Sequence, residues 1–385
     1  MGPDSPTALG PNQTRRPRIR RILVWGAIST AFLLAALALT LLTTHSVGVA
    51  GALLAAAIST IAIGIMVPVF LWVDRLEAEP ARLLWFALGW GALIATSLSI
   101  VGSLVLVDLL TTVGVDSDVA GAVIAAPIVE ELAKGAGVLA IFIFARREFN
   151  GVVDGIAYAG LVAIGFAYVE DILYLGQSYQ QLGQPGLITT FVLRVLFTPF
   201  AHPMFTVCFG ISLGLIAHRR RLSGAWIPVT GYLLAVGSHA FWNAATITGA
   251  WIPLYFIVQV PLFAAFVSMI IWARRREQRM IRDHLTGYGL NGWFLPAEVS
   301  MLTSPAERRK ARRWAKDAFG SAGEQAMRGF QDESAELAIA REHLERGDQG
   351  DYWQRREQQA LHAATRHRAG FSTSAGGVGV SQQRA

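Results

Sequence analysis

Residues 119–145 carry the sequence VAGAVIAAPIVEELAKGAGVLAIFIFA, an apolar run interrupted near its middle by Glu130, Glu131 and Lys134. An apolar stretch of about 20 residues is long enough to cross the hydrocarbon core of a bilayer as a helix. A charged side chain at that depth costs about 3 kcal/mol or more, so it marks a functional candidate. The two acids lie four and three residues before the lysine, which predicts that one ammonium group neutralises part of a carboxylate pair on one helical face.

The composition of the whole chain agrees with an integral membrane protein. Of its 385 residues, 53% are hydrophobic and only 16% are charged, whereas about a quarter of the residues of a soluble domain are charged. The net charge of +6 does not indicate a nucleic-acid partner, because the basic residues lie where membrane topology places them. The single cysteine, Cys208, excludes an intramolecular disulfide. A large excess of Arg over Lys, with many Ala and Gly residues, suggests a high-GC bacterial genome.

Seven further apolar runs accompany the run at 119–145, which predicts an all-α, polytopic fold with about eight transmembrane helices. They cover residues 22–42, 48–73, 83–107, 152–175, 187–217, 225–247 and 251–273. The run at 187–217 is longer than a span requires, so we expect it to be tilted or kinked at Pro199 and Pro203.

The loops between these runs alternate in charge. One set, at residues 43–47, 108–118, 176–186 and 247–250, contains no Lys or Arg. The other set contains Arg75 and Arg82, then Arg146 and Arg147, then Arg219, Arg220 and Arg221. Loops rich in Lys and Arg face the cytoplasm. The alternation therefore predicts a multi-pass protein of the bacterial cell membrane with both termini in the cytoplasm.

The same pattern divides the chain into four parts. We expect residues 1–21 to be a disordered basic arm, residues 22–273 to be the membrane domain with a catalytic core at about 119–247, residues 274–369 to be a cytoplasmic helical tail, and residues 370–385 to be disordered. Helical pieces are predicted at about 305–318, 322–346 and 350–367, the first behind a capping box at Ser304. The tail has no catalytic pattern, so we expect it to bind an unidentified regulator.

Polar side chains recur in the three runs that follow residues 119–145. They are Asp154, Glu170 and Asp171 in the first, Arg194, Thr198, His202 and Thr206 in the second, and His239, Trp242 and Asn243 in the third. At about 1.5 Å per residue, most of these groups lie at overlapping depths near the middle of the membrane. We therefore expect one polar cavity that opens more easily to the outside than to the cytosol. Asp154 lies near the start of its run and is expected to be a helix-start residue.

Glu, His and Asn side chains in such a cavity are suited to hydrolysis by two routes. A carboxylate can act as the general base toward a water while His and Asn stabilise an oxyanion, or His and Glu can hold zinc, which activates the same water. The sequence lacks HExxH, and Ser238 and His239 are adjacent and therefore point apart. A proton-coupled transporter or channel that uses the same Glu/His cluster, and a non-catalytic scaffold, remain alternatives at this point.

Four segments resemble the motifs of the PrsW family of intramembrane proteases, which is related to the CAAX prenyl endopeptidases and bacteriocin-processing enzymes. PIVEELAK at 127–134 resembles the EExxK motif, and Asp154-Gly155 with GFAYVED at 165–171 resembles the DG and GFAxxEN segment. HPMFT at 202–206 and HAFWN at 239–243 resemble the third and fourth motifs. The motifs occur in the family's order, one on each predicted span between residues 119 and 247.

The resemblance implies a membrane-embedded endopeptidase that acts on membrane-anchored protein substrates, such as an anti-sigma factor cut on its extracytoplasmic side. It implies catalytic roles for Glu130, Glu131, Glu170, His202, His239 and Asn243, with support from Lys134, Asp171, Thr206 and Trp242. If a zinc ion takes part, the candidate ligands are Glu131, Glu170, His202 and His239. The chain departs from the family pattern at one position, because Asp171 stands where the motif has Asn.

Overall fold

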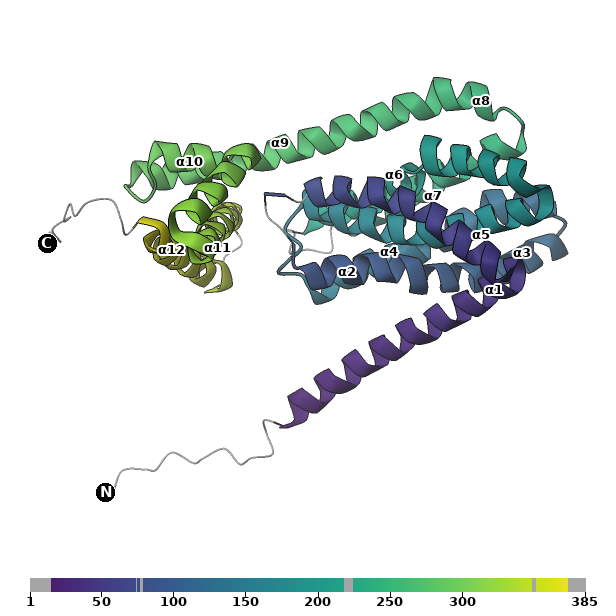
Figure 1. The fold of residues 1–385 in the computed structure, drawn as a ribbon, viewed down its shortest axis with the longest axis horizontal. Coiled ribbons are helices and arrows are strands. Elements are labelled where there is room, and N and C mark those ends of the chain that lie inside the picture. Colours follow the sequence, from purple (N-terminus) through teal and green to yellow (C-terminus); the bar gives the residue numbers. More distant parts are fainter. Residues whose placement is uncertain (1–14, 74, 77–78, 218–223, 348–350, 373–385) are drawn as a thin grey trace, which may run out of the picture.

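The computed structural model describes residues 15–73, 75–76, 79–217, 224–347 and 351–372. Every regular element within these residues is a helix (Figure 1). The predicted all-α class is therefore confirmed. Figure 1 shows a bundle of helices followed by a smaller helical domain, with α9 running from one to the other.

The helices follow the predicted apolar runs, with short π-helical turns (η) at several junctions. In chain order they are α1 (Arg15–Val73), α2 (Ala81–Gly89), η1 (Trp90–Ala95), α3 (Thr96–Thr112), η2 (Val119–Ala125), α4 (Ala126–Phe144), α5 (Val152–Thr190), η3 (Phe191–Phe197), α6 (Ala201–Ile216), α7 (Trp226–Ile247), α8 (Trp251–Leu254), η5 (Tyr255–Gln259), α9 (Val260–Leu290), α10 (Pro296–Leu302), α11 (Pro305–Glu345) and α12 (Asp351–Ser372).

Four stretches of the described residues are long and apolar enough to cross a membrane: Leu23–Val73, Ala81–Thr112, Val152–Ile216 and Trp251–Leu290. The predicted count of about eight spans is therefore not confirmed. Two of these stretches are kinked at glycines with positive φ, Gly48 at 73° and Gly183 at 66°. α4 falls outside the four because it carries three ionisable side chains within its length.

The run at 187–217 is broken where proline predicts a kink. η3 ends at Phe197, α6 begins at Ala201, and Pro199 lies in the non-helical residues between them. Pro203 lies in the first turn of α6, where a missing backbone N–H costs little. As a result Arg194 and His202 lie on two separate helical segments rather than on one continuous helix.

α5 lies at the centre of the bundle, because its residues 153–166 are all buried. It approaches α6 through two glycines. A Cβ atom built on Gly155 would lie 2.1 Å from the carbonyl oxygen of Gly210, and one built on Gly210 would lie 2.1 Å from that of Gly155. No larger residue fits at this crossing, so the pair fixes the distance between the helices that carry Glu170 and His202.

The helical domain after the bundle has its own apolar core, which includes Ile281, Leu285, Phe330 and Leu337. Leu76, from the loop between α1 and α2, packs into the same core and so joins the two parts. The predicted helix start at Ser304 is confirmed, because its hydroxyl accepts a hydrogen bond from the Glu307 N–H at 3.3 Å. The predicted helical pieces of the tail correspond to α11, which is kinked at Gly320, and to α12.

Some sequence predictions lie partly or wholly outside the described residues. They are the disordered arm, of which the described residues 15–21 are helical, the basic loop at Arg219–Arg221, and the C-terminal residues 373–385.

Candidate active site in the membrane domain

α4 carries the first three residues of the site on one face. The Nζ atom of Lys134 lies 3.1 Å from Oε2 of Glu130 and 2.9 Å from Oε1 of Glu131, so the predicted pairing is confirmed. The lysine side chain is fully buried, and its ammonium lies 4.0 Å from the centre of the Phe166 ring. α4 is held from the other side by Trp90, whose indole N–H donates to the carbonyl of Ala133 at 2.9 Å.

α6 brings His202 to this ammonium group. Nδ1 of His202 lies 2.9 Å from Nζ of Lys134, and Nε2 lies 2.6 Å from Oε2 of Glu170 on α5. An ammonium group can only donate, so Nδ1 must accept and Nε2 must carry the proton that it donates to Glu170. Both ring nitrogens of His202 are therefore engaged, and the histidine links α4 to α5.

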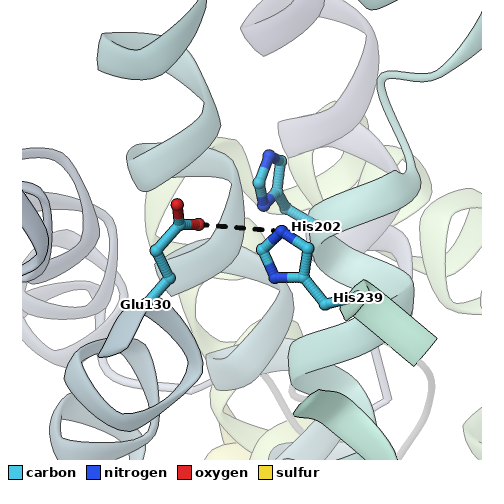
Figure 2. Close-up of side chains that lie close together, drawn as sticks. All are labelled: Glu130, His202 and His239. Carbon is cyan, nitrogen blue, oxygen red and sulfur yellow. Dashed lines mark ion pairs between the residues drawn. The ribbon is translucent and has the colours of Figure 1, made fainter. Parts of the chain in front are cut away.

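α7 contributes His239, which faces both acids of α4. Its Nδ1 lies 3.1 Å from Oε1 of Glu131, and its Nε2 lies 3.9 Å from Oε2 of Glu130. Figure 2 shows Glu130 and His239 pointing toward one another, with His202 beside them. The Phe205 ring stacks on the imidazole at a centroid distance of 4.9 Å and fixes its plane. A proton on Nδ1 donated to Glu131 leaves Nε2 as the unprotonated nitrogen next to Glu130.

The two adjacent acids of α4 differ in their surroundings. Glu131 is held at both oxygens, because Oε1 contacts Lys134 and His239 while Oε2 accepts a hydrogen bond from the Thr206 hydroxyl at 2.8 Å. Glu130 instead lines two cavities. Glu131 is thus enclosed by polar partners, whereas Glu130 borders open space.

Glu170 and Asp171 share one cation. Nη2 of Arg194 lies 2.5 Å from Oε2 of Glu170, and its Nε lies 2.7 Å from Oδ1 of Asp171. The guanidinium also lies 4.2 Å from the centre of the Tyr174 ring. The acid that replaces the family's Asn is therefore paired with Arg194.

Asn243 lies one helical turn after His239 on α7. Its side-chain N–H donates to the carbonyl of Ala122 in η2 at 2.8 Å. The amide has a second N–H, and the residue lines the same cavity as Glu130. Trp242 lines this cavity too and contacts the edge of Phe205.

The cavity has a volume of about 490 Å³. It brings together side chains of α4, α5, η3, α6 and α7, among them Glu130, Glu170, Asp171, Arg194, His202, His239 and Asn243. Four carboxylates of the cluster, at Glu130, Glu131, Glu170 and Asp171, face two permanent cations, Lys134 and Arg194. With neutral histidines the cluster carries an excess of negative charge, which favours a bound cation or a proton held by one of the groups.

The residues also fit a metal ion by donor type. Donor atoms of Glu130, His202 and His239 all lie within 4.8 Å of one another, and one carboxylate with two imidazoles is a common zinc-binding set. The bond from His239 to Glu131 has the form of the outer contacts that orient metal-binding histidines. The carboxylate of this set is Glu130, which the sequence analysis did not include among the expected ligands. His202 would have to release Lys134 or Glu170 to bind the metal.

Most of the residues selected from the sequence therefore come together in space. Asp154 lies apart, at the first turn of α5, where its Oδ2 accepts hydrogen bonds from the N–H groups of Asn150 and Gly151. This is the expected helix-start role. The sequence analysis did not select Tyr174 or the hydroxyls of Thr96, Ser99 and Ser103, which line a second cavity at Glu130. The spacing of these hydroxyls, three and then four residues, marks one helical face in an apolar run and could have identified them.

Comparison with known proteins agrees with the family resemblance of the four motifs. Residues 79–266 match the sequence model of the PrsW family intramembrane metalloprotease. A Protease PrsW of Geobacillus kaustophilus is 28% identical over 141 residues, which is 37% of this chain and 57% of the relative. A Protease PrsW of Oceanobacillus iheyensis is 36% identical over 72 residues, which is 19% of this chain and 30% of the relative. No solved structure matches.

The matched region contains all the motifs and the whole cluster described above, whereas the alignments cover little more than half of one curated relative and less than a third of the other. Over residues 79–266, just under half of its length, the chain is therefore similar to the PrsW family.

Proposed function

We propose that this chain is an intramembrane endopeptidase that hydrolyses peptide bonds of membrane-anchored proteins. The observation that carries the proposal is the position of Glu130, which faces a cavity within reach of His202 and His239. The family match supports a protease and does not favour the alternative of a proton-coupled transporter or channel.

The hydrolytic step follows from the surroundings of Glu130. Its carboxylate takes a proton from a water in the cavity, the water oxygen attacks the scissile carbonyl, and Glu130 then returns the proton to the leaving amide nitrogen. The second N–H of the Asn243 amide, which lines the same cavity, would donate to the oxyanion. Glu131, Lys134 and Thr206 act as positioning residues, because their hydrogen bonds are with other members of the cluster.

Hydrolysis assisted by a zinc ion is the second route that we propose to test. Glu130, His202 and His239 would hold it, and it would supply Lewis-acid polarisation of the carbonyl and acidify a bound water. Glu130 would then be a ligand rather than the base, so the two routes assign it different roles.

We further propose that the protein lies in the bacterial cell membrane with both termini in the cytoplasm. Three contacts support this topology, because they gather basic loops and the tail at one end of the bundle. Nη1 of Arg308 donates to the carbonyl of Leu76 at 2.6 Å, the guanidinium of Arg147 lies 4.7 Å from the centre of the Tyr352 ring, and Arg82 lies 4.0 Å from Glu148. In Figure 1 the loop after α3 and the start of α8 lie at the opposite end.

The substrate class and the tail complete the proposal. We propose that the substrate is a single-span protein such as an anti-sigma factor, cut on its extracytoplasmic side. We propose that the tail at 274–369 binds a regulator and does not take part in catalysis, so removal of residues 300–385 leaves cleavage intact.

A cleavage assay on the purified full chain tests the proposal. Wild type, His202→Ala and His239→Ala are incubated in lipid vesicles with a panel of single-span membrane proteins, with and without a zinc chelator. We expect cleavage by the wild type and loss of cleavage in both variants. Full activity in either histidine variant would contradict the site. Loss of wild-type cleavage on chelation, restored by added zinc, favours the metal route, and insensitivity favours Glu130 as the base.

A further inference from the structure

A second cavity meets the candidate active site along α3. Its volume is about 290 Å³. Thr96, Ser99 and Ser103 of α3 line it, as does Gln177 of α5. It shares Ala126, Glu130, Glu170 and Tyr174 with the larger cavity. The two cavities therefore border the same carboxylates, Glu130 and Glu170, and we call them the two arms of the site.

One hydroxyl in this wall lacks a hydrogen-bond partner. Ser99 is 4% exposed, and its Oγ has no partner among the described residues. Serines and threonines on helices usually donate back to a carbonyl one turn earlier, as Thr43, Thr60 and Ser238 do here. The buried Oγ atoms of Ser59 and Ser97 also lack a partner, but of these three serines only Ser99 lines this cavity, where a bound group could satisfy it.

The chemistry of the wall fits an extended peptide. Each residue of a peptide main chain carries an N–H and a C=O that must be paired at membrane depth, and a hydroxyl both donates and accepts. Thr96 and Ser103 are seven positions apart on α3, which is about 10 Å along a helix. At about 3.3 Å per extended residue, this length matches about three residues of substrate.

A substrate that is cut in the middle of its chain needs a cavity on each side of the catalytic centre. A peptide whose scissile bond lies at Glu130 must leave the catalytic centre in both directions. The larger cavity, with Asn243 and Arg194, can receive one side of the peptide, and the arm along α3 can receive the other. The hydroxyls and the amide of Gln177 add no charge to this second arm, which suits main-chain groups better than an ionic side chain.

We propose that the cavity along α3 binds the main chain of the substrate on one side of the scissile bond, over about three residues, through Ser99, Ser103 and Gln177. The proposal rests on the proposed endopeptidase function and adds the binding site of the substrate segment. Under it, Ser99 and Ser103 are substrate-binding residues, and the arm at Asn243 receives the other side of the cleaved bond.

A kinetic experiment tests the hydroxyls without changing the shape of the fold. Ser99→Ala in the full chain removes one hydrogen bond, so we expect KM for a cleaved single-span protein to rise about 2- to 10-fold with kcat largely kept. Ser103→Leu fills the arm and should remove most cleavage. Val105→Leu is the matched control, because this α3 residue is 66% exposed and lies outside both cavities.

A cross-linking experiment tests the same site without turnover. Ser103→Cys is introduced into a Glu130→Gln, Cys208→Ala chain and oxidised in vesicles with the same single-span protein, which carries single cysteines near its cleavage position. We expect the thiol introduced by Ser103→Cys to form a disulfide with substrate cysteines that lie within about three residues of the scissile bond on one side. Leu104→Cys is the matched control, because Leu104 is the next residue along α3 and is 69% exposed.

The outcomes separate the binding arm from the proposed function. Cleavage by the wild type together with an unchanged KM in Ser99→Ala and no cross-link from position 103 would overturn the binding arm alone. A fall in kcat at constant KM, again without a cross-link, would assign the cavity to water entry and overturn it as well. Failure of the wild type to cleave any protein of the panel would contradict the endopeptidase function, and the binding arm with it.

Discussion

Two buried cations, one in each part of the molecule, have different partners. Lys134 of the bundle is fully buried among Glu130, Glu131 and His202, all of which are ionisable. Arg308 of the helical domain, whose side chain is 5% exposed, binds the Leu76 carbonyl and reaches the largely exposed Asp332. A cation held by a main-chain carbonyl joins two parts of a fold, whereas one held by ionisable groups beside a cavity is arranged for chemistry.

The largest effect is expected when the cation of the bundle is removed. Lys134→Met leaves Glu130 and Glu131 without their shared ammonium and takes the donor from Nδ1 of His202. Loss of one partner of a buried pair costs about 3–5 kcal/mol, so we expect a lower unfolding temperature and no measurable cleavage. Lys316→Met is the control, because the side chain of Lys316 is 60% exposed in its pair with Glu324. Wild-type stability and cleavage in Lys134→Met would show that the comparison is wrong.

A smaller effect is expected at the second cation of the membrane domain. Arg194→Gln keeps a donor near Glu170 and Asp171 but loses the charge and one of the two bonds. We expect the cleavage rate to fall about 10- to 100-fold, because Glu170 orients His202 and is itself held less firmly. Steady-state kinetics on a cleaved single-span protein measure this. Complete loss in a folded variant would mean that Arg194 acts directly on the substrate.

A change at Arg308, the buried cation of the helical domain, should affect the fold and leave the cleavage rate almost unchanged. Burial lowers the pKa of Arg308 to about 10, so it stays protonated at neutral pH and needs its partners. Arg308→Met removes its bonds to Leu76 and Asp332, which we expect to loosen α11 from the bundle by about 1–3 kcal/mol. Hydrogen exchange of α11 should rise while cleavage stays within about twofold of wild type.

Arg309→Met is the matched control for this change, because Arg309 is the next residue and is exposed. Loss of cleavage in Arg308→Met with unchanged exchange in α11 would break the distinction between the two cations. This point change is milder than removal of residues 300–385, which would uncover the buried Ile281 and Leu285.

The smallest effect is expected at the position where the chain departs from the family motif. Asp171→Asn keeps an oxygen that accepts a hydrogen bond from Nε of Arg194, which lies 2.7 Å from Oδ1. We expect cleavage within about threefold of wild type, because neutral and charged acceptors differ modestly in a bond that is retained. A loss comparable to that of Lys134→Met would give Asp171 a role of its own in the reaction.

The sequence predicted those parts of the site that depend on spacing within one helix. The pairing of Lys134 with Glu130 and Glu131 follows from their separation on α4, and the helix-start role of Asp154 follows from its place in its run. The break at Pro199 follows from the chemistry of proline. Each of these features is local and does not depend on how the helices pack.

The parts that depend on packing between helices could not be predicted. Whether Glu130 or Glu131 faces the cavity is set by the rotation of α4 against α6 and α7, which places Thr206 on Glu131. The binding arm was missed because a Ser or Thr in an apolar helix ordinarily satisfies itself, and only the structure shows that Ser99 does not. The number of spans was not confirmed, because two of the four stretches each join two predicted runs across the kinks at Gly48 and Gly183, and α4 and α7 are not among the four.

The most direct test of the central claim compares wild type with Glu130→Gln in the vesicle cleavage assay, with thermal unfolding measured on the same samples. The substitution keeps the shape of the side chain and removes the carboxylate that faces both cavities. General-base catalysis contributes about 10²- to 10⁴-fold, so we predict a loss of at least that size with an unfolding temperature close to that of wild type. Cleavage at the wild-type rate by a folded Glu130→Gln protein would contradict the assignment.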